Sequence, residues 1–178
     1  YIGNGSYKVN ADSDKRWNNS KEIPNQIDYA RSYKNIQGNA FFSAKSFLNK
    51  NQSVTKLLSE NQYKYPALPT VVPNSIKKMV IVPTANNVLT DPTSSRFTVQ
   101  YPMYSKVRYV MVYGAEPNSK IDINNPSHII DKIAFKDNID TVEVVIPAYK
   151  LNKNTSCAIT FIDYYGNESE ATLVNFSM

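Results

Sequence analysis

The protein has 178 residues, of which 42% are hydrophobic and 20% are charged, a balance typical of folded globular proteins rather than disordered chains. Its single cysteine and single histidine exclude an internal disulfide and a zinc site built from these ligands, and no cofactor motif is present. Residues 1–75 hold ten Lys/Arg and five Asp/Glu, so the net charge of +5 lies there, and residues 76–178 hold ten of each. This shift predicts a domain boundary near residue 75.

The distribution of charge and of apolar residues bears on possible partners. The basic residues are scattered singly along the sequence, whereas nucleic-acid binding needs clustered positive charge, so we expect no nucleic-acid partner. No apolar stretch approaches the roughly 20 residues that span a bilayer, so we expect no membrane-spanning segment.

In chain order, the first elements are a short strand within residues 1–9 and a polar loop over residues 10–19. Apolar residues then recur at spacings of three and four, which predicts an amphipathic helix over residues 20–34. Ser20 is suited to cap this helix, and Pro24 falls in its first turn, where a missing N–H costs little.

A second strand and a second helical region follow. Residues 38–43 are apolar without alternation, which predicts a strand buried on both faces. Residues 46–49 form a helical turn, and Ser53 caps a helix that turns Val54, Leu57 and Leu58 inward. The order strand–helix–strand–helix predicts parallel strands joined by right-handed crossovers.

Two parallel strands leave both sheet edges open, so residues 1–75 should pack against other segments, self-associate or remain partly disordered. We therefore expect either a light-scattering mass above that of a single chain or incomplete hydrogen-exchange protection of residues 38–43. A compact monomer with full hydrogen-exchange protection of residues 38–43 would contradict this prediction.

The sequence pattern changes after residues 65–73. We interpret this segment as a connector, which is semi-rigid because it contains three prolines. Short apolar runs then alternate with turn-rich stretches, the signature of an immunoglobulin-like β-sandwich. The predicted strands are 77–82, 96–101, 106–113, 129–135, 141–146, 156–163 and 171–176.

The second half ends in Asp163-Tyr164-Tyr165-Gly166-Asn167-Glu168-Ser169 after an apolar run. This turn resembles the one that follows the penultimate strand of bacterial fibronectin type III domains. The resemblance implies that Cys157 stands where those domains usually carry a tyrosine.

The first half carries several separated blocks: Tyr1-Ile2-Gly3, Tyr7-Lys8-Val9, Glu22-Ile23-Pro24-Asn25-Gln26-Ile27, Phe42-Ser43-Ala44-Lys45 and Tyr63-Lys64-Tyr65-Pro66-Ala67-Leu68. In order and spacing they resemble the C-terminal end of the glycosyl-hydrolase-like 10 family. The resemblance implies α/β plus all-β architecture: the last two βα units of a TIM-type (β/α)₈ barrel in residues 1–75, then a fibronectin III-like sandwich in residues 76–178.

The active site of such a barrel lies at the carboxyl ends of the strands, and a glycosidase needs two carboxylates there. Residues 6–10 and 42–45 would form this rim, and they contain no Asp or Glu, so we predict no catalytic residue in this chain. Asp12 and Asp14, slightly further on, are either solvated loop residues or a peripheral acid.

Binding a sugar does not require the two carboxylates that hydrolysis requires. The candidate substrate-binding residues, which offer aromatic faces or hydrogen bonds suited to hydroxyls, are Tyr7, Asn10, Trp17, Ser43 and Lys45. The alternatives are that Trp17 packs beneath its own loop, that Tyr7 fills the barrel mouth and that Lys45 pairs with a carboxylate. We interpret His128 as an exposed strand-edge residue and Cys157 as a small core residue.

These inferences give two functional hypotheses. In the first, the chain is the C-terminal fragment of a glycoside hydrolase acting on polysaccharide or peptidoglycan glycan, inactive alone because the catalytic carboxylates lie elsewhere. In the second, it is a non-catalytic carbohydrate-binding, protein-binding or spacer module. The family resemblance alone implies a bacterial secreted, periplasmic or cell-envelope location, with a glycan as partner through the rest of the barrel.

Overall fold

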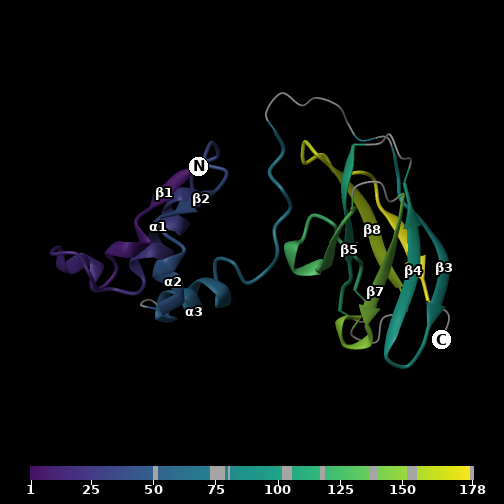
Figure 1. Ribbon diagram of the computed structural model, residues 1–178, viewed down its shortest axis with the longest axis horizontal. Helices are drawn as coiled ribbons and strands as arrows, with labels where there is room; N and C mark the ends of the chain where they lie inside the picture. Colours follow the sequence, from purple (N-terminus) through teal and green to yellow (C-terminus); the bar gives the residue numbers. More distant parts are fainter. Residues whose placement is uncertain are drawn as a thin grey trace. The chain divides into compact units, whose positions relative to one another are not determined.

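The computed structural model describes residues 1–49, 52–72, 79, 81–101, 106–116, 119–136, 140–151 and 156–176. The chain divides into two compact units, Tyr1–Lys64 and Tyr65–Met178, each with its own hydrophobic core (Figure 1). This division lies ahead of the proline-containing segment, whereas the charge distribution places the boundary after it. Within the described residues, no helix has the length and apolar character needed to cross a membrane.

The first unit is a small α/β structure. Strands β1 (Ile2–Asn4) and β2 (Asn39–Phe41) pair in parallel, with Gly3 opposite Ala40, which confirms the predicted parallel pair. The helices are α1 (Glu22–Arg31), α2 (Lys45–Asn49) and α3 (Gln52–Glu60), and 3₁₀ turns occupy η1 (Ser6–Lys8) and η2 (Lys15–Trp17).

Helices α1 and α3 supply most of the first core. Its buried side chains are Val9, Ile23, Ile27, Val54 and Leu58. The prediction that Ser20 caps α1 is wrong, because Lys21 holds the N-cap position and makes no capping bond with its side chain. Asn19 orders this entry instead, since its Oδ1 accepts a hydrogen bond from the Lys21 amide at 3.0 Å.

The prediction that the second strand is buried on both faces is also wrong. Phe41 packs towards the helical core, but Ala40 is exposed. A Cβ built on Gly3, which is paired with Ala40, would meet nothing within 4 Å. The face of the pair opposite the helices is therefore uncovered within the described residues, which is why an apolar strand carries an exposed position.

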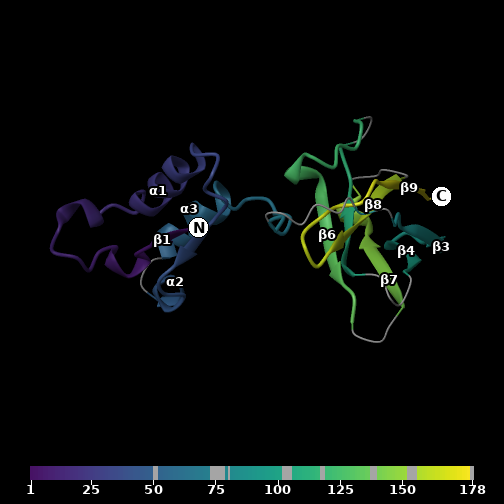
Figure 2. The same ribbon diagram turned by 90° about the horizontal axis from the view of Figure 1, so that it is seen from above.

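The second unit contains two antiparallel sheets (Figure 2). One has the order β3 (Thr84–Thr90), β4 (Ser94–Gln100), β7 (Thr141–Pro147). The other has the order β6 (Ile129–Ala134), β5 (Val107–Tyr113), β8 (Ser156–Asp163), β9 (Thr172–Asn175). Short 3₁₀ turns precede β6 and follow β7, at η3 (Pro126–His128) and η4 (Ala148–Lys150).

Both sheets contribute to one core. Phe97, Val99, Val144 and Ile146 come from the first sheet, and Val110, Val112, Ile159 and Phe161 from the second. Buried and more exposed side chains alternate along β4 and β7, because every second side chain points to the same face of a sheet. One face of each strand therefore lies in the core.

The predicted strands from residue 96 onward coincide with β4 to β9, and the first predicted strand does not. Residues 77, 78 and 80 of that strand lie outside the described residues, and Met79 and Ile81 are not in a strand. The strand not predicted is β3, which is mostly exposed and has a register shift between Asn86 and Leu89. Its polar, irregular sequence lacks the alternation that indicates a strand.

The proline-containing segment lies against the second unit. Leu68 packs on the cluster formed by Met111, Tyr113 and Ile162, and the Val72 amide donates to the Tyr165 carbonyl at 2.8 Å. These contacts order residues 65–72 as part of the second unit.

The turn after β8 is held by its own side chains. Asp163 Oδ1 accepts from the amides of Tyr165 and Asn167, both at 2.8 Å. Glu168 Oε1 accepts from the hydroxyls of Tyr113 and Thr160, both at 2.6 Å. Gly166 has φ +83°, a conformation that favours glycine. The motif recognised in the sequence is therefore a structural turn.

Candidate functional site

The carboxyl ends of β1 and β2 meet at one surface. The Phe42 carbonyl accepts hydrogen bonds from Ser6 Oγ at 3.0 Å and from the Tyr7 amide at 3.3 Å. The Phe42 amide donates to the Asn4 carbonyl at 3.0 Å. We call residues 6–10 and 42–45 the rim, because these bonds hold the two segments after the parallel strands side by side.

Aromatic surface is available at the rim. The rings of Tyr7 and Phe42 pack edge to face, with centroids 5.8 Å apart and an interplanar angle of 89°. Tyr7 is 52% exposed and Phe42 is 72% exposed, so both rings present area to solvent. Sequence reasoning missed Phe42 as a site residue, because an apolar residue at a strand end is normally assigned to the core.

Ser43 and Lys45 belong to the same surface. Ser43 is half-buried and follows Phe42 through a cis peptide bond, and Lys45 is exposed at the start of α2. The structure thus brings Tyr7, Ser43 and Lys45 into one region, as the order of the strands predicts.

Asn10 and Trp17 lie at the base of the loop between η1 and η2. The Asn10 amide donates to the Trp17 carbonyl at 3.0 Å, and the Asn10 side chain is exposed. Trp17 is half-buried against the core of α1 and α3, and the Lys8 ammonium lies 5.3 Å from its ring. Trp17 therefore uses part of its surface to pack the loop, as the structural alternative proposes.

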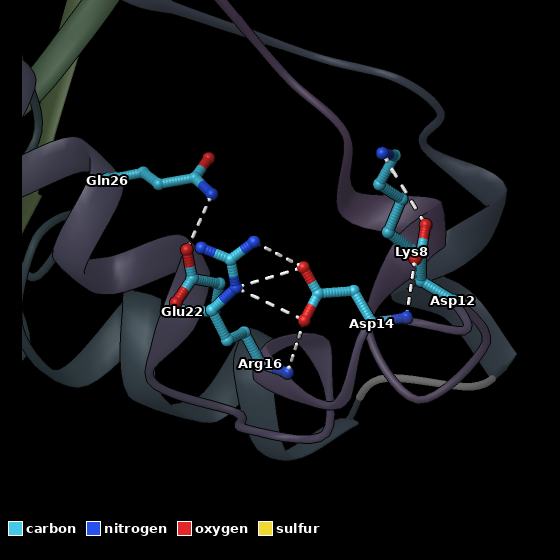
Figure 3. Close-up of polar contacts among 6 residues, drawn as sticks. All are labelled: Lys8, Asp12, Asp14, Arg16, Glu22 and Gln26. Atoms are coloured by element: carbon cyan, nitrogen blue, oxygen red, sulfur yellow. Dashed lines mark hydrogen bonds and ion pairs between the residues drawn. The ribbon is translucent and has the colours of Figure 1, made fainter.

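Asp12 and Asp14 stabilise this loop through local contacts (Figure 3). The Asp14 carboxylate accepts from the Arg16 amide at 3.0 Å and from Arg16 Nη2 at 2.6 Å. The hydrogen bonds from the Arg16 side chain hold the pKa of Asp14 below its ordinary value. Asp12 accepts from the Asp14 amide at 3.0 Å and lies 3.5 Å from Lys8 Nζ. Both carboxylates are therefore engaged as loop residues.

A polar chain that the sequence reading missed lies beside the rim. Asn4, at the end of β1, is only 2% exposed and donates from Nδ2 to Gln26 Oε1 at 3.1 Å. Gln26 donates in turn to Glu22 Oε1 at 2.9 Å. In the described structure Asn4 Oδ1 has no hydrogen-bond partner. The sequence feature that could have identified Asn4 is a polar residue within a short apolar strand. Asparagine is so common in this sequence that the feature does not stand out.

The other reactive side chains lie in the second unit. Cys157 is fully buried, which confirms its prediction as a core residue, and burial raises the pKa of its thiol to about 12. His128 accepts at Nδ1 from the Asp122 amide at 2.9 Å. Across the described ranges, no group of three or more His, Cys, Asp or Glu side chains is placed to hold a metal ion.

No protein-family model matches the sequence. The chain is 27% identical over 180 residues to the Bacillus subtilis (strain 168) protein named glycosyl hydrolase YngK. The match covers 97% of this chain and 33% of that protein, so the chain spans about a third of the length of the curated relative. The sequence is therefore distantly related to part of a glycosyl hydrolase.

Proposed function

We propose that this chain is the C-terminal part of a glycoside hydrolase that acts on polysaccharide or peptidoglycan glycan. In this proposal the first unit is the last two βα units of a TIM-type barrel, and it supplies substrate contacts. The observation that carries the proposal is the rim, where hydrogen bonds to Phe42 join the carboxyl ends of two parallel strands beneath exposed aromatic rings. Active sites of (β/α)₈ barrels lie at these strand ends.

The catalytic acids are assigned to the rest of the proposed barrel. A glycosidase places two carboxylates on either side of the scissile bond. The nearest acids to the rim in sequence, Asp12 and Asp14, are engaged with Lys8 and Arg16. The chain alone is therefore expected to bind but not to hydrolyse glycan.

The second unit fits a fibronectin III-like sandwich. Two antiparallel sheets sharing one core, together with the Asp163–Ser169 turn, support this assignment. Such a unit would act as a spacer or a binding module that follows the barrel in the sequence, and the proposed location is the bacterial cell envelope or exterior.

The rim is tested in the full-length protein, with upstream sequence restored. Tyr7→Ala and Phe42→Ala should each raise KM for a soluble glycan about fivefold with little change in kcat, because a lost aromatic contact removes roughly 1 kcal/mol of uniform binding. Ser43→Ala should have a smaller effect in the same direction. Steady-state hydrolysis assays measure both constants.

The matched control is Tyr149→Ala, since Tyr149 is an equally exposed aromatic residue, 76% exposed, that belongs to the second unit and not to the rim. An unchanged KM in both rim variants, or hydrolysis by the chain alone, would refute the proposal. Glycan binding by a full-length protein without turnover would favour the alternative, a non-catalytic binding module.

A further inference from the structure

Cations and tyrosine rings alternate across one region of the second unit. Arg108 Cζ lies 5.1 Å from the ring centroid of Tyr109 and 5.8 Å from that of Tyr164. Lys132 Nζ lies 5.2 Å from the Tyr109 centroid. A second pair adjoins the first, because Lys106 Nζ lies 5.1 Å from the Tyr165 ring and donates to its hydroxyl at 3.0 Å. We call this set the basic–aromatic stripe: Lys106, Arg108, Tyr109, Lys132, Tyr164 and Tyr165.

The four-stranded sheet assembles the stripe from three distant segments. The pairing of β5 with β8 shifts register between Val107 and Tyr109, which leaves Arg108 as an extra residue on β5. Such a bulge re-aims side chains, and here it allows consecutive residues, Arg108 and Tyr109, to meet on one side. The Tyr164 amide donates to the Lys106 carbonyl at 3.0 Å, which fixes the β8 turn beside β5.

The cations of the stripe have no carboxylate within ion-pair distance among the described residues. Lys106, Arg108 and Lys132 are all exposed. Two acids lie near the stripe. The hydrogen bond to Tyr165 and, to a smaller extent, the charge of Asp163 raise the pKa of Lys106, while the Asp163 carboxylate accepts an amide of its own turn. Asp131 lies 3.6 Å from Lys150 Nζ.

The rings add apolar area to this charge. Tyr164 is 56% exposed and Tyr165 is 39% exposed, so each offers part of its ring to a ligand. The C–H face of a sugar packs on such a ring, while a guanidinium or ammonium group beside it hydrogen-bonds an acid group on the same sugar. A neutral sugar would leave the three cations without an anionic partner.

We propose that the basic–aromatic stripe binds an acidic polysaccharide, a glycan chain that bears carboxylates along its length. The choice of glycan rests on the proposed function, and the choice of an acidic one rests on the charges. Nucleic acid is the competing ligand, because its phosphates could pair with the same cations and its bases could stack on the exposed parts of Tyr164 and Tyr165, and the test therefore includes it. The side chains of Arg108 and Lys132 make no hydrogen bond among the described residues, so their N–H groups can bind a carboxylate.

The test measures binding of the 178-residue chain to polygalacturonate by isothermal titration calorimetry, with fully methyl-esterified polygalacturonate as the uncharged counterpart. We expect binding of the acid form to be at least about tenfold tighter than that of the ester, and to weaken as ionic strength rises, because exposed charges are screened by salt. The triple variant Lys106→Ala, Arg108→Ala, Lys132→Ala should bind the acid form at least about tenfold more weakly.

A matched triple variant removes the same charges elsewhere: Lys56→Ala, Arg96→Ala and Lys120→Ala. These residues are exposed, and none belongs to the stripe. This control should bind the acid form within about twofold of the parent chain, because Lys56 and Arg96 already pair with Glu60 and Asp91 and because salt screens exposed charges. Far-UV circular dichroism and thermal melting confirm that both triple variants remain folded.

Three results would overturn the proposal: equal binding of the ester, equal losses in the two triple variants, or tighter binding of a single-stranded oligonucleotide than of polygalacturonate with the same number of charges. The proposed function fails separately. If the full-length protein hydrolyses glycan but the 178-residue chain does not bind polygalacturonate, only the stripe proposal is refuted. If the chain binds polygalacturonate but the full-length protein hydrolyses no glycan, only the proposed hydrolase function is refuted.

Discussion

Gly166→Ala is expected to lower the free energy of unfolding of the second unit by about 2 kcal/mol, because non-glycine residues are strained in this backbone region. Gly166 has φ +83°, and a Cβ at this position would lie 2.7 Å from the Thr70 carbonyl oxygen. That contact is with backbone and cannot be relieved by rotating a side chain. The substitution should therefore also displace residues 70–72 from the turn after β8.

The measurement is urea unfolding followed by far-UV circular dichroism. Gly3→Ala is the matched control, since its Cβ would meet nothing within 4 Å. The protein has a single tryptophan, Trp17, which lies in the first unit, so its fluorescence reports that unit separately. An unchanged midpoint for the second unit, or a shift seen only in Trp17 fluorescence, would contradict the strain argument.

Raising the pH from about 9 to about 12 is expected to destabilise the second unit. Burial raises the pKa of Cys157 from 9.0 to about 12, so the unfolded chain releases this proton at a lower pH than the folded one. Stability from this group is present below pH 9 and is lost as the pH rises, by about 1.4 kcal/mol per pH unit. Burial, followed by the hydrogen bond to Glu168, also raises the pKa of Tyr113 above 10.0, which steepens the loss above pH 10.

Unfolding free energies from urea titrations at several pH values give the slope directly. Cys157→Ala should flatten the dependence between pH 9 and 10, and Tyr113→Phe should flatten it above pH 10. Slopes rather than absolute stabilities are compared, because both substitutions also alter packing. A wild-type slope equal to that of the Cys157→Ala variant would show that the buried thiol does not contribute.

The sequence predicted most of the second unit and part of the first. Alternation of buried and exposed positions in β4 and β7 marks strands with one face in a core, whereas the apolar run of β8 marks a strand buried on both faces, and pattern alone locates all three. The pattern did not predict β3, because its asparagines and its register shift interrupt the alternation of apolar and polar residues. For the rim, strand order was sufficient to group Tyr7 with Ser43, since parallel strands place their carboxyl ends together.

The sequence by itself determined local matters: where apolar periodicity starts, which turn follows β8 and which residues can enter a core. Tertiary structure alone decided the contacts between distant residues. Lys106, Arg108 and Lys132 look scattered in the sequence, yet pairing of β5 with β6 and a bulge against β8 gather them beside tyrosine rings. Likewise Trp17 and Asp14 acquire loop-packing roles only through their neighbours. Periodicity encodes which face a side chain takes, whereas register and bulges set which side chains meet.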